Sequence, residues 1–179
     1  IERLRPSKSQ SKKTYVWKPS ANEARGKKYG NLVHELFQHL EWDKEAFLEK
    51  ISVRGDDEQA DPHLAEAVAA IRTCLESKPV AELVLKRPEG AVLWQERTAA
   101  LMHEGKLVTA VFDRVHVIPG KEAVVIDYKT NDCSLEQLKE MYQGQMDLYR
   151  IAVAKLCGLS VERVRCVLVH VRQGAIVEC

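Results

Sequence analysis

The sequence predicts an α/β (α+β) fold, with a mixed sheet flanked by helices, and three observations support this prediction. Apolar residues recur at helical spacing through the first half of the chain, between residues 24 and 85. Three apolar runs separated by glycine-containing turns follow, between residues 91 and 130. A helix with a capping pattern and two further apolar runs complete the chain. The expected order is α-β-β-β-α-β, with extra helices on the N-terminal side.

Four helical segments are expected before the sheet. Residues 27–41 carry leucine, valine and phenylalanine at spacings of three and four, which is typical of one apolar helix face. Residues 43–51 predict a short second helix. After an acidic loop, Asp61 is expected to cap a third helix that Pro62 begins. Residues 79–85 predict one more helical turn.

Three consecutive strands are expected to form the centre of an antiparallel sheet. Glycine-containing turns separate them, which is typical of hairpin connections. They are residues 91–105 (AVLWQERTAALMHEG), 106–120 (KLVTAVFDRVHVIPG) and 121–130 (KEAVVIDYKT).

The C-terminal part of the chain predicts a long helix and a final hairpin. Ser134 and Gln137 form a capping-box pattern at the start of the helix, and Gly158 is placed to end it. The apolar runs 164–171 and 175–179 are separated by a short glycine-containing turn. We therefore expect these two runs to extend the sheet.

Composition indicates one globular domain. The chain has 179 residues, of which 45% are hydrophobic and 30% charged. Five cysteines without a CxxC pair favour neither a disulfide framework nor a zinc ribbon. No apolar run approaches the roughly 20 residues of a membrane span, so we expect a cytoplasmic protein without a membrane partner. Because the chain begins with Ile1, we expect it to be part of a longer protein.

The basic residues are concentrated at the N-terminal end. Residues 1–28 carry a net charge of +7, whereas the remainder carries −6. Residues 1–22, rich in lysine, serine and proline, are expected to form a basic linker or arm, and residues 23–179 the folded domain. The arm is either a nucleic-acid contact or a solvated linker, and the two roles are compatible.

Two carboxylates and a lysine follow the apolar runs of neighbouring strands. Asp127 and Lys129 lie two residues apart, so both side chains point to the same face of a strand. Asp113 precedes Asp127 by 14 residues, a distance that fits a hairpin. Carboxylates are ligands for a hard divalent cation, and the backbone carbonyl of Tyr128 would add another oxygen. Lys129 would then lie near an attacking water. The alternative is a structural salt bridge between Lys129 and either aspartate.

Several short segments, taken in order, carry a resemblance to a known family. The chain resembles the RecB-type nuclease domain of the PD-(D/E)XK superfamily, and within it the C-terminal nuclease domain of AddA and RecB helicase-nucleases, over about residues 25–154. The segments are GNLVH, the acid of LWQE, AVFDRV, VVIDYKT and QMDLY. The resemblance implies a restriction-endonuclease-like core.

The resemblance also implies roles for individual residues. His34, four residues after Gly30, would reach the metal from the first long helix. Asp113, Asp127 and the carbonyl of Tyr128 would complete the ligands, and Lys129 would be catalytic together with the two aspartates.

Further residues would support the site or bind nucleic acid. Gln145 and Tyr149 match a Gln-x-x-x-Tyr motif and share one helix face. Thr130 completes the Asp-Tyr-Lys-Ser/Thr motif. Glu96 is a weaker match, because the two residues after it are not the usual Pro-Phe, and Ala110 replaces a common glycine.

The function implied is that of a Mg²⁺- or Mn²⁺-dependent deoxyribonuclease using one or two ions, with exonuclease activity in double-strand-break repair and recombination. Its partners would be single-stranded DNA and a helicase motor, in the same chain or a partner subunit, because the sequence contains no Walker A motif. The cysteine pattern of relatives that hold an iron-sulfur cluster is absent, so no such cluster is expected. Two alternatives remain open: a non-cleaving DNA-binding or scaffolding module, and a metal-free domain in which the charges only pair.

Overall fold

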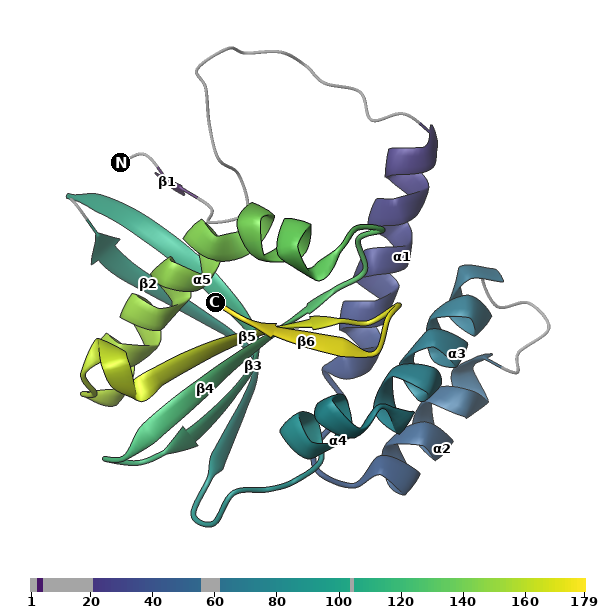
Figure 1. The fold of residues 1–179 in the computed structure, drawn as a ribbon, viewed down its shortest axis with the longest axis horizontal. Helices are drawn as coiled ribbons and strands as arrows, with labels where there is room; N and C mark the ends of the chain where they lie inside the picture. The colour runs from purple at the N-terminus through teal and green to yellow at the C-terminus, as the bar shows by residue number, and fades with distance from the viewer. Residues whose placement is uncertain (1–2, 5–20, 56–61, 104) are drawn as a thin grey trace.

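The computed structural model describes residues 3–4, 21–103 without 56–61, and 105–179. The order of elements confirms the expected α-β-β-β-α-β arrangement with extra N-terminal helices (Figure 1). The elements are β1 (Arg3–Leu4), α1 (Ala21–Phe37), α2 (Lys44–Gly55), α3 (Pro62–Glu76), α4 (Lys78–Val84), β2 (Val92–His103), β3 (Lys106–Ile118), β4 (Glu122–Lys129), α5 (Leu135–Cys157), the 3₁₀ turn η1 (Val161–Arg163), β5 (Val164–His170) and β6 (Ala175–Glu178).

The described strands form one mixed sheet, as expected. Its order is β1-β3-β4-β5-β6, and β2 pairs with β3 along almost its whole length. The β2–β3, β3–β4 and β5–β6 pairs are antiparallel, whereas β4 and β5 run parallel. A parallel neighbour requires a crossover, and α5 provides it. The last strands therefore extend the sheet as predicted.

Helices cover both faces of the sheet and divide the core in two. Helix α5 lies across one face, and α1 to α4 gather on the other (Figure 1). In β4, Val125 packs beneath α5, whereas Ile126 and Tyr128 pack against α1 to α4. Each such buried side chain contributes about 1.5–3 kcal/mol to stability. The alternation of β4 between two cores determines which way its last residues point.

Helix α1 starts and ends earlier than the sequence predicted. It spans Ala21–Phe37 rather than residues 27–41. The chain tightens after Phe37, where the N–H of Leu40 donates to the Phe37 carbonyl at 2.9 Å. The buried guanidinium of Arg114 then donates to the carbonyl of Leu40 and, at 2.7 Å, to that of Glu41. An arginine on a distant strand therefore holds the chain just after the helix, a contact that the apolar spacing alone could not indicate.

The caps of the other helices follow the sequence more closely. Asp43 accepts a hydrogen bond from the N–H of Ala46 at 2.9 Å at the start of α2. Helix α5 begins with the predicted capping box of Ser134 and Gln137 and ends at Gly158, whose φ of 64° is left-handed.

The predicted N-terminal arm lies mostly outside the described residues. Arg3 and Leu4 form β1 and pair in parallel with β3, which the sequence did not predict. Helix α1 begins at Ala21, within the last two residues of the predicted arm. The division at residue 22 stays a prediction. Among the described helices, none is both long and apolar enough to cross a membrane.

Candidate active site

Strands β2 and β3 both change face at the centre of the sheet. Trp94 and Ala99 in β2 pack on the α5 side although they are five residues apart, so the alternation has shifted between them. In β3, Phe112 packs on the α5 side, whereas Arg114 reaches the carbonyl of Val84 on the opposite side. Between Trp94 and Ala99 lies Glu96, whose φ of 46° is left-handed and unfavourable for a residue with a Cβ atom.

This change of face brings the carboxylates of Glu96 and Asp113 close together. The paired residues on either side of Glu96 place it directly opposite Asp113. Asp113 then points toward α1, where His34 Nδ1 lies 3.0 Å from its Oδ2 atom. Strain of this kind persists only where the surrounding structure enforces it, and it is concentrated at functional sites.

Strands β3 and β4 part at the same point. Their ladder ends at the pair Arg114 and Ile126. Beyond it, the N–H of Tyr128 donates to Asp113 Oδ2 at 2.9 Å instead of to a backbone carbonyl. The carbonyl of Val111 accepts from the hydroxyl of Tyr149 at 2.7 Å. Side chains thus satisfy backbone groups that the parting strands leave open.

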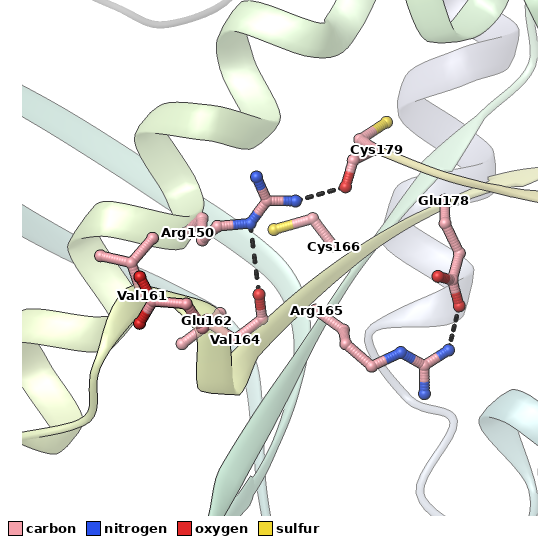
Figure 2. Close-up of a pocket in the computed structure, with 8 residues that line it drawn as sticks. All are labelled: Arg150, Val161, Glu162, Val164, Arg165, Cys166, Glu178 and Cys179. Carbon is pink, nitrogen blue, oxygen red and sulfur yellow. Dashed lines mark hydrogen bonds and ion pairs between the residues drawn. The ribbon is translucent and has the colours of Figure 1, made fainter.

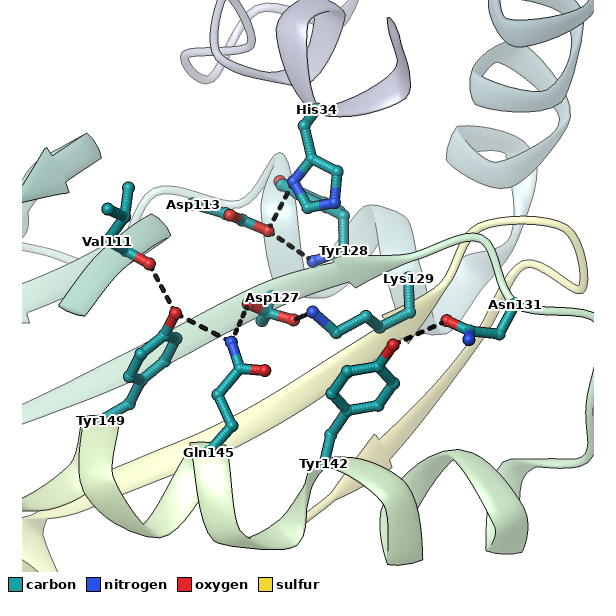
Figure 3. A network of polar contacts seen from close by, with 10 residues as sticks. All are labelled: His34, Val111, Asp113, Asp127, Tyr128, Lys129, Asn131, Tyr142, Gln145 and Tyr149. Atoms are coloured by element: carbon teal, nitrogen blue, oxygen red, sulfur yellow. Dashed lines mark hydrogen bonds and ion pairs between the residues drawn. The ribbon is translucent and has the colours of Figure 1, made fainter. Parts of the chain in front are cut away.

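On the α1 side, three side chains from three elements form a potential metal-binding cluster. His34 of α1, Glu96 of β2 and Asp113 of β3 each offer one ligand atom, and these atoms lie within 4.8 Å of one another. Figure 3 shows His34 and Asp113 facing each other above β4. We call this group the α1-side cluster.

The charges in the α1-side cluster depend on one another. Burial would lower the pKa of His34, but the Asp113 carboxylate raises it above its usual value. Burial would likewise raise the pKa of Asp113, but His34 holds it below its usual value. Partial burial and the Asp113 charge raise the pKa of Glu96. Two carboxylates thus share one imidazole, and added positive charge would relieve their repulsion.

On the α5 side, a second group surrounds Asp127. Its carboxylate forms a close ion pair with Lys129 and accepts from Gln145 Nε2 at 3.3 Å. Gln145 also donates to the hydroxyl of Tyr149 at 2.8 Å, as Figure 3 shows. The side chains of Lys129 and Asp127 are only 11% and 2% exposed. We call Asp127, Lys129, Gln145 and Tyr149 the α5-side network.

Burial also controls protonation in the α5-side network. Burial raises the pKa of Asp127 to about 6, against the lowering effect of the Lys129 ammonium. Burial would lower the pKa of Lys129, but Asp127 raises it above its usual value. Lys129 therefore stays protonated near neutral pH.

The α1-side cluster fits a divalent cation. One imidazole nitrogen and two carboxylates suit Mg²⁺ or Mn²⁺, and the imidazole favours Mn²⁺. Two ligands at right angles on an ion with bonds of about 2.1 Å lie roughly 3 Å apart. The 3.0 Å between His34 and Asp113 agrees with that spacing. Within the described part of the chain, the buried Gln145 Oε1 has no hydrogen-bond partner beside Asp127, so a polar occupant would also be accommodated there.

The structure brings most of the sequence-predicted residues together. His34 and Asp113 are in contact, while Gln145 and Tyr149 line Asp127 from one face of α5. Glu96, predicted only as a supporting residue, lies within the α1-side cluster.

Three other predicted residues have different surroundings. The Asp127 carboxylate contacts Lys129 and Gln145, and its role as a metal ligand stays a prediction. Tyr128 contacts Asp113 through its N–H, so the ligand role of its carbonyl stays a prediction. Thr130 lies against α1, where a Cβ atom on Gly30 would be 3.2 Å from its hydroxyl oxygen.

Tyr142 and Asn131, which lie beside Lys129, were not among the predicted site residues. The Lys129 ammonium lies 4.3 Å from the centre of the Tyr142 ring, and the Tyr142 hydroxyl donates to Asn131 at 3.2 Å. Tyr142 precedes Gln145 by three residues and so shares its helix face, a spacing that could have indicated it.

A cavity of about 360 Å³ lies away from this site, between α5 and the C-terminal strands (Figure 2). Arg150 spans it, donating to the carbonyls of Val164 at 3.2 Å and of Cys179. Arg165 pairs with Glu178 across the β5–β6 ladder. These contacts tie the last strand to the domain, so the polar groups have structural partners.

Comparison with known protein families agrees with the geometry. A search of curated proteins found no match. The family model of the PD-(D/E)XK nuclease superfamily matches residues 8–178, nearly the whole chain. Members of this superfamily are usually metal-dependent nucleases. The chain therefore belongs to the PD-(D/E)XK nuclease superfamily.

Proposed function

We propose that this protein is a divalent-metal-dependent deoxyribonuclease that hydrolyses phosphodiester bonds. The observation that carries the proposal is the meeting of the α1-side cluster with Asp127 and Lys129 where β3 and β4 part. A cation site beside a buried ammonium is what hydrolysis of a phosphodiester by water needs.

The residues of the site would have separate roles in metal binding, charge stabilisation and positioning. His34, Glu96 and Asp113 would hold the cation, with Asp127 in reach as a further ligand. A bound divalent cation supplies Lewis-acid stabilisation of phosphate charge and a more acidic water. The Lys129 ammonium, paired with the Asp127 carboxylate, would stabilise negative charge and orient the water. Gln145 and Tyr149 orient Asp127.

We further propose the RecB or AddA type of nuclease, using Mg²⁺ or Mn²⁺ and degrading single-stranded DNA as an exonuclease. The motifs around His34, Asp113, Asp127 and Gln145 support this assignment. A helicase motor, in the same chain or a partner subunit, would deliver the strand during double-strand-break repair.

The direct test is a cleavage assay on single-stranded DNA, duplex DNA and RNA of one sequence. We expect single-stranded DNA to be degraded with Mg²⁺ or Mn²⁺ and to stay intact with EDTA. Binding of DNA without cleavage under every metal condition would instead support the scaffolding alternative. Neither binding nor cleavage, and no uptake of metal, would mean that the ion pairs of this site are only structural.

A further inference from the structure

A second cavity adjoins the site, beyond Lys129. Its volume is about 420 Å³, within the range of about 300–1,000 Å³ for small-molecule pockets. One wall is α1, from Gly26 to His34, and the other is the segment after β4 with Tyr142. Arg172, from the turn between β5 and β6, completes the lining. Because Lys129 and His34 lie at its edge, a ligand in this cavity would touch the proposed reacting phosphate.

The lining carries more positive than negative charge. Lys27, Lys129 and Arg172 face a single lining carboxylate, Asp132. Arg172 is held in place, since Nε donates to the Thr130 carbonyl at 3.0 Å and the guanidinium carbon lies 4.4 Å from the centre of the Tyr29 ring.

The outer nitrogens of Arg172 are weakly engaged by comparison. Its ion pair with Glu66 is long, 3.8 Å, which is beyond hydrogen-bond range. Lys27 is exposed on α1. Two cations at the far side of the cavity are therefore available to an anion.

Helix α1 presents bare backbone to this cavity. Gly26, Gly30 and His34 are spaced by four residues and lie on one face. Gly30 is explained by the close approach of Thr130. For Gly26, a Cβ atom would meet no described heavy atom within 4 Å, although glycine inside a helix costs roughly 1 kcal/mol relative to alanine. The fold of the described residues gives no reason for this glycine, whereas a ligand in the cavity does.

We propose that this cavity holds one nucleotide of a single-stranded nucleic acid, next to the phosphodiester that is cleaved, with Lys27 and Arg172 contacting its far phosphate. The inference rests on the proposed nuclease function and adds a subsite to it. A cavity of about 420 Å³ suits a single unpaired nucleotide rather than a duplex.

The first test fills the cavity without disturbing the fold. Gly26→Leu replaces a helical glycine where a side chain has room, so thermal stability should stay equal or rise. The matched control is Gly144→Leu in α5, since a Cβ atom there also meets no described atom and Gly144 does not line the cavity. Gly26→Leu should raise KM for a 12-mer oligothymidylate at least tenfold, with kcat within about twofold of that of the wild-type protein. Gly144→Leu should leave both unchanged.

The second test measures, in the absence of metal, how much the charges of Lys27 and Arg172 contribute to DNA binding. Binding of a labelled 12-mer oligothymidylate is measured in EDTA as a function of salt, for Lys27→Gln, Arg172→Gln and the double variant. Each lost phosphate contact should flatten the slope of log affinity against log salt by about 0.7 for a single strand. Lys121→Gln, in the turn at the opposite end of β4, is the control and should not change it. Arg172→Lys, which keeps the charge, should restore most of the slope.

The outcomes distinguish a failure of the subsite proposal from a failure of the proposed nuclease function. If the wild-type protein cleaves DNA but Gly26→Leu keeps its KM and the charge variants keep the slope, the subsite is wrong and the nuclease stands. If the wild-type protein never cleaves, the proposed function fails, while the binding slopes in EDTA still decide whether the cavity takes a strand. Equal affinity for duplex and single-stranded probes would overturn the single-nucleotide assignment.

Discussion

The two sides of the sheet handle buried charge differently at the point where β3 and β4 part. On the α5 side, the Asp127 carboxylate has its own cation, Lys129, and a donor from Gln145. On the α1 side, Glu96 and Asp113 lie together with His34, whose side chain is 32% exposed. The α5-side network thus contains one acid and its own ammonium, whereas the α1-side cluster contains two acids and one imidazole.

This difference indicates where an ion belongs. Buried carboxylates that share a site repel each other, and a cation that both contact removes that penalty. Partial burial raises the pKa of Glu96, and the nearby Asp113 carboxylate raises it further. We therefore expect the α1-side cluster to bind metal and the α5-side network to position Lys129.

The largest expected effect is the loss of the shared acid. Asp113→Asn keeps an oxygen that can accept from the Tyr128 N–H but removes the negative charge. Replacing a group that only orients a metal ligand typically lowers metal affinity about 10- to 100-fold. We therefore expect the loss of this ligand to lower metal affinity by more than about 100-fold. Cleavage should become undetectable. Calorimetric titration with Mn²⁺ measures the affinity. Binding as tight as that of the wild-type protein would contradict the role of the α1-side cluster as the metal site.

Replacing the lysine should separate the two sides. Lys129→Met keeps the chain length but removes the ammonium, so cleavage should fall by about 10²–10³-fold, the range for removing one donor that stabilises developing charge. Without its partner, the pKa of Asp127 should rise above about 6. Single-turnover kinetics measure the rate, and the Mn²⁺ titration should remain close to that of the wild-type protein. An undiminished rate would remove Lys129 from the mechanism.

A smaller effect is expected from the hydroxyl that bridges the α5-side network. Tyr149→Phe removes the acceptor of the buried Gln145 amide and the donor to the Val111 carbonyl. A buried donor left unsatisfied costs about 1–3 kcal/mol. Urea unfolding measures this change. Tyr142→Phe is the matched control, because its partner Asn131 is only partly buried, and it should cost less than about 1 kcal/mol. Equal losses for the two variants would mean that the parted strands do not depend on Tyr149.

The sequence predicted the elements more completely than it predicted the site. Apolar spacing and turn residues located the helices and strands because these signals are local. Asp127 and Lys129 were recognisable for the same reason, since they follow a buried run. The geometry around Glu96 was not, because its left-handed backbone and the face change of β2 and β3 depend on the whole hairpin.

Long-range contacts explain the other differences. Arg114 of β3 donates to the carbonyl of Leu40 just beyond α1, although the two residues are 74 apart in the sequence. No pattern within α1 encodes that contact, so its end was placed four residues too late. Asp127 was expected among the metal ligands, and that role stays a prediction, but its contacts with Lys129 and Gln145 were not predicted. The positions of these acids at strand ends predict that they lie close together, but not which side chains they contact.

The smallest expected effect is a proton released on metal binding. Asp113 raises the pKa of His34, and a protonated imidazole cannot bind metal. Below that raised pKa, metal must displace the proton, so about one proton should be released and affinity should fall with decreasing pH. Above it, release should cease. Calorimetry in two buffers of different ionisation enthalpy measures the number of protons released. If His34→Ala releases the same number, the proton comes from a group other than His34.

The most direct test of the central claim is the position of the ion itself. A crystal of this protein grown with Mn²⁺ should give an anomalous peak on the α1 side, within about 2.5 Å of His34, Glu96 and Asp113. The same crystal of Lys129→Met should keep the peak, and that of Asp113→Asn should lose it. A peak bound elsewhere, or none at saturating Mn²⁺, would contradict the assignment of the α1-side cluster as the metal centre.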